Sequence, residues 1–304
     1  MSMTQVQPVE VFPNTSAAIL AYLARRTMDT VGDQVRRAGA VVVGVSGETD
    51  VYPIPGGHKA DTGSLFVTSW TAEHWLVGQG EGQPLFYLVA IDPHEVVTGG
   101  TATGLVSSGQ RALLFLSGPR HDAAVTALPL PAYSLAPGEG SLQLLQEETF
   151  DGRGRPVTED RSAQVAAIQE AVEWYIALPE ADVAGSALRR KALLAALDHT
   201  NPHIAHCAVR SLAQPGDEQM AKAFRQRLPA ASDPHYQIDL LVGLWLTAAQ
   251  IGEAEAALEQ LMRSRRRSRW LAAWDIHATS AGRGRRPQSL YAPQPPSLPA
   301  MNTG

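Results

Sequence analysis

Histidine and cysteine side chains gather in one short stretch of the sequence, at His199, His203, His206 and Cys207. Residues three or four positions apart on a helix share a face, so His203, His206 and Cys207 have the spacing of metal ligands. The alternative is that Cys207 packs inside a helical core while the histidines cap or flank a turn. A zinc site requires three or four convergent ligands with supporting partners. We therefore favour packing and predict no metal and no cofactor.

Two side chains could act as nucleophiles, Ser46 and Cys207. Ser46 lies in the run GVSGE (44–48), which lacks the second glycine of the G-x-S-x-G elbow and leads into a loop instead of a helix. We interpret Ser46 as a turn residue. A neighbouring histidine could activate Cys207, but burial in a helical core explains this cysteine better. The sequence therefore assigns no catalytic residue.

The sharpest charge feature is a run of arginines near the C-terminal end. It comprises Arg263, Arg265, Arg266, Arg267 and Arg269, and Trp270 follows directly. Basic residues beside aromatic ones can hold phosphates and stack on bases, or bind anionic lipid. The alternative is a solvated helix terminus, where arginines complement the helix dipole. The net charge of the whole chain is −5, so nucleic acid or an anionic membrane would bind through this region alone.

The elements that position these residues change character along the chain. Residues 16–37 carry apolar side chains at helical spacing and predict one helix. Strands are predicted at 40–45, 64–70, 85–92, 111–117 and 123–128, with a loop at 50–63. Gly44, inside the first strand, indicates a bulge or a close backbone approach. Short strands separated by turn residues are typical of a small barrel or sandwich.

The C-terminal half is predicted to be helical throughout. A first helix begins near residue 155, with Pro156 and Thr158 as its entry. Further helices are predicted at 186–197, 202–213, 217–228, 234–251, 253–263 and 268–278, separated by proline and glycine breaks. The fold class is therefore α+β. The expected parts are an N-terminal segment with one helix (1–39), a β-barrel-like domain (40–154), a helical domain (155–280) and a disordered basic tail (281–304).

Residues 187–212, ALRRKALLAALDHTNPHIAHCAVRSL, resemble one HEAT repeat. A helix ends near Asp198, Asn201 and Pro202 form the turn, and a second helix has a small residue in its middle. Ala205 stands where the family commonly has an arginine. The resemblance implies a stack of helical repeats, which requires at least three units. Such stacks present extended faces, so the implied partner is another protein.

Residues 40–128 are similar to an OB-like, netrin-type barrel pattern found in many exported bacterial proteins of uncharacterised function. The pattern has a VVVGxV strand, a vLKG turn and a G-x-x-x-LLFL strand in that order. Here AVVVGV (40–45) opens it, and WLVG (75–78) stands at the turn with valine in place of lysine. Gly109 and residues 113–116 match the last strand. The resemblance implies a small barrel. Netrin-type metalloproteinase inhibitors use cysteines that this segment lacks, so no such activity is implied.

Length and composition bound the remaining possibilities. The chain has 304 residues, of which 44% are hydrophobic, enough for two domains with their own cores. The single cysteine excludes an internal disulfide. No apolar run approaches the ~18 residues of a membrane span, and the first apolar cluster precedes its arginines, unlike a signal peptide. As written, the chain is expected to be cytoplasmic. A true start upstream of Met1 would leave export open.

These observations together favour a non-enzymatic interaction or scaffold protein. One alternative is an adaptor that binds an anionic polymer or membrane through the arginine run. Another is an enzyme whose unrecognised site lies at the barrel mouth or at the domain junction, where pockets often form. An enzyme would show a pocket with clustered ionisable residues of perturbed pKa.

Overall fold

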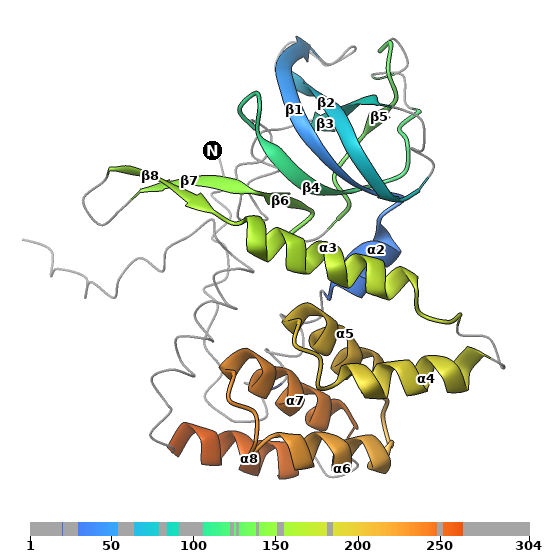
Figure 1. Ribbon diagram of the computed structural model, residues 1–304, viewed down its shortest axis with the longest axis vertical. Coiled ribbons are helices and arrows are strands. Elements are labelled where there is room, and N and C mark those ends of the chain that lie inside the picture. Colours follow the sequence, from blue (N-terminus) through green and yellow to red (C-terminus); the bar gives the residue numbers. More distant parts are fainter. Residues whose placement is uncertain are drawn as a thin grey trace, which may run out of the picture.

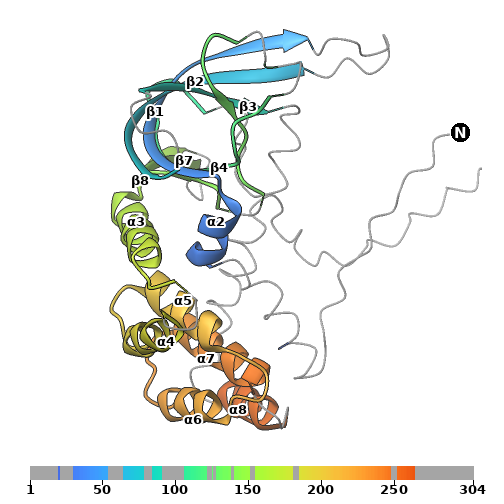
Figure 2. The same ribbon diagram turned by 90° about the vertical axis from the view of Figure 1, so that its right-hand side faces the viewer.

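The computed structural model of the chain describes residues 20, 30–53, 64–78, 84–90, 106–121, 125, 128–137, 140–150, 155–180, 185–247 and 252–263. The fold is mixed α+β, as the sequence predicts. Two helices, α2 (Val31–Arg37) and α3 (Ser162–Ile176), lie between a curved sheet and a group of further helices. Figures 1 and 2 show this arrangement from two directions. Among the described residues, no helix has both the length and the apolar character to cross a membrane.

A six-stranded mixed sheet forms from the N-terminal half. Its strands are β1 (Ala40–Pro53), β2 (Ser64–Val77), β3 (Leu85–Ala90), β4 (Arg111–Leu116), β5 (Ala132–Tyr133) and β6 (Leu142–Leu144). They lie in the order β5-β3-β2-β1-β4-β6, and every neighbouring pair is antiparallel except β3 and β5, which are parallel. A two-stranded ribbon of β7 (Gln146–Phe150) and β8 (Pro156–Asp160) follows.

The sheet is curved but is not closed into a barrel. Within the described residues, one isolated bridge joins Leu116 at the end of β4 to Leu135, just after β5. Beside it, the Ser117 amide donates to the Ser134 carbonyl at 2.8 Å. The two edges of the sheet therefore approach each other without a continuous ladder of hydrogen bonds, and the OB-like barrel stays a prediction.

Four of the five predicted strands are present, and two of them are longer than expected. β1 continues to Pro53 because it pairs with β2 as far as Pro53 and Ser64, so residues 50–53 are strand and not loop. The ladder shifts register between Val43 and Gly44. A Cβ atom at Gly44 would lie 2.8 Å from the Thr71 carbonyl oxygen, which confirms the close backbone approach.

Three boundaries differ from the sequence-based expectations. Of the strand predicted at 123–128, the structure describes Val125 and Leu128, and the Leu128 amide donates to the Val125 carbonyl at 3.0 Å, which is a turn contact and not a strand pairing. The expected helix entry near Pro156 is strand β8, because pairing with β7 overrides the local proline signal. The single helix predicted over 16–37 is interrupted at Thr30, whose extended backbone and side chain form the N-cap of α2.

The later helices agree closely with the sequence. They are α4 (Gly185–Ala196), α5 (Pro202–Leu212), α6 (Glu218–Arg227), α7 (Pro234–Thr247) and α8 (Gly252–Arg263). Asn201 caps α5 by accepting a hydrogen bond from the His203 amide at 3.0 Å, and Asp217 caps α6 at the Met220 amide at 3.1 Å. Such caps satisfy backbone donors that a helix start otherwise leaves unpaired. The helix predicted at 268–278 lies outside the described residues.

One apolar cluster runs from the sheet into the helices. Val41 and Val43 of β1 and Phe115 of β4 belong to the same buried cluster as residues of α2 to α8. The alternate strand residues, such as Val42 and Leu114, pack on the other face of the sheet with Trp70. The core is therefore continuous across residues 154–155, where the sequence predicts a domain boundary, and the two-domain layout stays a prediction.

Gly243, in the middle of α7, offers a test of this packing. A Cβ atom there would lie 2.7 Å from Cγ1 of Val209 and 3.1 Å from Cε2 of Phe224. Gly243→Ala should therefore lower the free energy of unfolding by about 1–3 kcal/mol, although alanine ordinarily favours a helix over glycine by about 1 kcal/mol. Urea denaturation measures the change. Gly252→Ala is the matched control, because a Cβ there meets nothing within 4 Å; equal effects of the two substitutions would contradict the packing argument.

Candidate functional site

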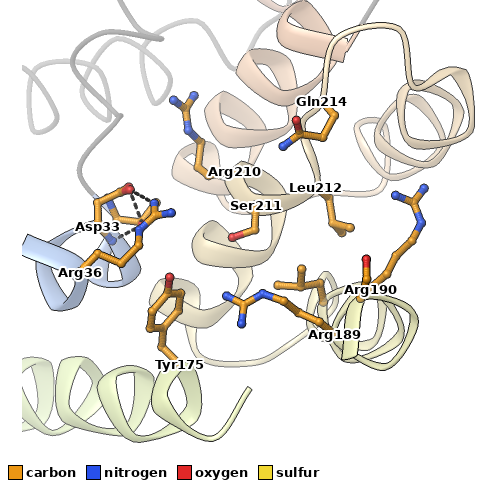
Figure 3. Close-up of a pocket in the computed structure, with 12 residues that line it drawn as sticks. Asp33, Arg36, Tyr175, Arg189, Arg190, Arg210, Ser211, Leu212 and Gln214 are labelled. Carbon is orange, nitrogen blue, oxygen red and sulfur yellow. Dashed lines mark hydrogen bonds and ion pairs between the residues drawn. The ribbon is translucent and has the colours of Figure 1, made fainter. Parts of the chain in front are cut away.

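A cleft of about 570 Å³ opens where α2, α3, α4 and α5 meet (Figure 3). It is lined by Thr30, Asp33, Arg36, Tyr175, Ser186, Arg189, Arg190, Leu193, Arg210, Ser211, Leu212 and Gln214. Four of these twelve side chains are arginines and one is a carboxylate. The cleft therefore concentrates positive charge on a chain whose net charge is −5.

The short helix α2 brings the first arginine, Arg36, to the cleft. Thr30 and Asp33 form a capping box, in which each side chain bonds the backbone amide of the other residue at 3.0–3.1 Å. Gly32 packs so closely on the Tyr175 ring that a Cβ atom would lie 2.5 Å from Cε2. Its amide also donates to Sγ of Cys207 at 3.4 Å. These contacts fix α2 against α3 and α5.

Helix α4 supplies two neighbouring arginines that are held by different partners. Arg189 donates to the Pro179 carbonyl at 2.9 Å and stacks over the Tyr175 ring at 5.6 Å from its centroid. Arg190 pairs with Asp217 at 2.8 Å, and Asp217 in turn caps α6. Both guanidinium groups are thus oriented before any ligand binds, which reduces the entropy lost on binding.

Two carboxyl groups that pair with the cleft arginines have lowered pKa values. Burial raises the pKa of Asp33, but hydrogen bonds from Thr30 and Arg36 outweigh this effect and lower it. Burial also raises the pKa of Asp217, but the hydrogen bonds from Arg190 and the Met220 amide, together with the charge of Arg190, outweigh this effect and lower it. Arg36 and Arg190 therefore each face an ionised carboxylate.

Arg210, half-buried on α5, faces a different kind of carboxyl group. Asp239 of α7 is buried, and Nε2 of His206 lies 3.4 Å from its Oδ1. Burial raises the pKa of Asp239 to about 8, against the opposing charges of Arg210 and His235. At neutral pH the Asp239 carboxyl is thus largely protonated. Burial lowers the pKa of Arg210, but with an ordinary value of 12.5 the group stays charged.

Cys207 and the neighbouring histidines have different surroundings in the structure. Cys207 is buried, and burial raises the pKa of its thiol to about 11, so the thiolate needed for nucleophilic attack is scarce. His199 accepts a hydrogen bond from the Asn201 amide at 3.0 Å, at the turn before α5. Burial and the neighbouring His206 lower the pKa of His203 to about 4. In the described part of the chain, no three His, Cys, Asp or Glu residues converge as metal ligands.

Ser46 is a strand residue and not the turn residue that the sequence suggests. It is buried in β1, its hydroxyl donates to the Ser107 carbonyl at 2.7 Å, and it accepts from the Gln110 amide at 2.9 Å. These bonds hold the connection before β4 in place. The serine is thus engaged in structure.

The predicted anion-binding run lies almost entirely outside the described residues. Arg263 is the last residue of α8. Arg265, Arg266, Arg267, Arg269 and Trp270 all lie beyond that point. Their role in binding an anionic partner therefore stays a prediction.

The four arginines of the cleft do not stand out in the sequence. Arg189 and Arg190 are adjacent, as are Arg36 and Arg37, but such pairs are common on solvated helix faces. Only the packing of α2 against α3 and α5 brings Arg36 near residues more than 150 positions away in the chain. No local pattern encodes that contact.

Comparison with known proteins adds no assignment: no protein-family model matches the chain, and no match is found among curated proteins. The geometry of the cleft is what indicates a function. Preoriented guanidinium groups bind carboxylate and phosphate oxygens through paired hydrogen bonds. The cleft is therefore a candidate site for an oxyanion.

Asp239 gives a pH-dependent test of the buried group behind the cleft. Its pKa is about 8 in the folded protein against an ordinary 3.8, so between these values the folded chain retains a proton that the unfolded chain has lost. Stability from this group therefore falls as pH rises, by at most about 1.4 kcal/mol per pH unit, and levels off above pH 8.

Asp239→Asn should remove this slope. Urea denaturation at pH 5, 7 and 9 should show that the free energy of unfolding of the variant rises relative to that of the wild type as pH rises. Asp50→Asn, at an exposed position of β1, controls for the loss of one carboxylate. A variant that parallels the wild type at all three pH values would contradict the assignment.

Proposed function

We propose that this protein is a non-enzymatic binding protein whose arginine-lined cleft takes an oxyanion group of its ligand or partner. The observation that carries the proposal is the convergence of Arg36, Arg189, Arg190 and Arg210 on one cleft of about 570 Å³. Ligand sites commonly have this size and combine a few polar groups that fix orientation. Anion affinity is then the property that the site supplies.

The lining favours binding over bond cleavage. Its carboxylate, Asp33, is committed to the N-cap of α2 and to the ion pair with Arg36. Its aromatic residue, Tyr175, supports Arg189 and packs on Gly32. General acid–base catalysis requires a group that can reach the substrate proton and change its protonation state near neutral pH. Guanidinium groups do not do so.

Strand order supports the OB-like part of the proposed architecture. β1 pairs with both β2 and β4, β3 pairs with β5 in parallel, and the isolated bridge links the end of β5 back to β4. OB folds are partly open five-stranded barrels that bind extended ligands on their sheet face, whereas the sheet here has six strands and is not closed. The likeness bears on fold, and it carries no activity.

Helix packing supports the HEAT-like part. α4 packs on α5, α6 packs on α7, and α5 packs on α7. Helical repeats stack helix pairs on one another in this way to present an extended face. A protein partner that offers an acidic or phosphorylated group at the cleft would use both features. The adaptor role of the arginine run from Arg263 to Arg269 is the alternative, carried by sequence alone.

Arg36→Gln tests the site against a matched neighbour. Arg36 lines the cleft, whereas Arg37 is the next residue of the same helix end and is exposed outside it. Isothermal titration with inorganic phosphate at low salt should show binding that weakens about fivefold in Arg36→Gln, because a hydrogen bond from an exposed charged group contributes about 1 kcal/mol. Arg37→Gln should bind as the wild type does.

Salt provides the second measure, since added salt screens exposed charge pairs. Phosphate affinity of the wild type should fall with sodium chloride, and less steeply in Arg36→Gln. If Arg36→Gln and Arg37→Gln lose the same phosphate affinity, the protein attracts phosphate by net charge alone and the cleft is not the site.

A further inference from the structure

Three of the four arginines that line the cleft lie at two separate places, and Arg189, over the Tyr175 ring, lies between them in Figure 3. Arg36 and Arg210 lie on the side of α2, where both interact with Asp33. Arg190 lies on the opposite side and pairs with Asp217 of the α6 cap. Asp217 accepts from Nη2 of Arg190 at 2.8 Å, and a guanidinium has five N–H donors. Each side of the cleft can thus offer donors to an anionic group of its own.

The lining has one aromatic side chain, Tyr175, and its ring already contacts other groups. Arg189 stacks over the ring, Gly32 packs against its edge, and the side chain is only partly exposed. The apolar lining, Leu193 and Leu212, is only 5% and 2% exposed. Proteins that hold a nucleobase ordinarily stack it on an aromatic or apolar face. This lining therefore does not suit a base.

Polar side chains also line the cleft beside the arginines. Ser186 starts α4, Ser211 lies near the end of α5, and Gln214 lies in the turn that follows. Hydroxyl and amide groups can both donate and accept hydrogen bonds. They suit a ligand whose body carries hydroxyl groups or further oxyanion oxygens.

We propose that the ligand of this cleft is a small hydrophilic polyanion, with at least two phosphate or carboxylate groups and no aromatic base. One group is bound by Arg36 and Arg210, and the second by Arg190. The inference rests on the proposed anion-binding function and narrows it to a chemical class. Sugar bisphosphates, polyphosphates and polycarboxylates have this chemistry, and nucleotides do not.

Isothermal titration of the full chain with defined probes tests the class. Pyrophosphate should bind about tenfold tighter than orthophosphate, because a second anchored group adds charge-assisted hydrogen bonds. ADP carries the same two phosphoryl groups and should bind no tighter than pyrophosphate. Citrate against acetate gives the same comparison for carboxylates, and the tighter of pyrophosphate and citrate identifies the source of the anion.

Arg190→Gln separates the second anchor from general attraction. It should reduce the advantage of pyrophosphate over orthophosphate from about tenfold to near unity, because the second group loses its anchor. Lys191→Gln removes one charge at the next, exposed residue of α4 and should leave both affinities unchanged. Circular dichroism confirms that both variants are folded.

Three outcomes would overturn the inference. ADP binding more than about tenfold tighter than pyrophosphate would reveal a base subsite. If pyrophosphate binds no tighter than orthophosphate and citrate no tighter than acetate, the cleft has no second anchor. The same conclusion follows if Arg190→Gln and Lys191→Gln change the pyrophosphate affinity equally. If orthophosphate still binds and is weakened by Arg36→Gln, the proposed function survives these failures. If no anion binds at all, the proposed function falls with it.

Discussion

The docking of α2 is the contact on which the rest of the structure depends. A helix of seven residues is too short to be stable by itself, so its cap and its burial must hold it. The capping box of Thr30 and Asp33 completes its first turn, and Gly32 allows it to approach Tyr175. β1 starts only three residues after α2 ends. The position of the sheet relative to the later helices, and of Arg36 within the cleft, therefore follows from this one small helix.

Electrostatics in the helical part depends on unequal burial. Asp33 and Asp217 keep some solvent and gain cationic partners, so their pKa values fall. Asp239 lies deeper, and desolvation outweighs the nearby Arg210. Carboxylates of one chemical type thus differ in charge at neutral pH, because Asp33 and Asp217 are ionised whereas Asp239 is largely protonated. The depth of each carboxyl group, and not the composition of the chain, therefore decides the charge balance around the cleft.

Local signals predicted the parts of the fold that are decided locally. Asn201-Pro202 and Asp233-Pro234 mark helix starts because their side chains and fixed dihedrals act within one turn, and β1 to β4 follow from β-branched and apolar runs. Pro156 carried the same local signal, yet pairing with Gln146–Phe150 made it a strand. The cleft was not predictable, because it needs side chains from α2, α4 and α5 that meet only after packing. A glycine beside an aromatic ring, as at Gly32, leaves no periodic trace in sequence.

The burial of Cys207 has a practical consequence. It is the only cysteine in the chain, and its sulfur sits under the first turn of α2. A thiol reagent can reach it only when that turn lifts or when α5 opens. The rate of modification therefore reports how often the sheet-bearing half separates from the helices, without any engineered label. Ligand-dependent protection of this one atom would read out, in real time, whether an occupied cleft tightens the joint between the two halves.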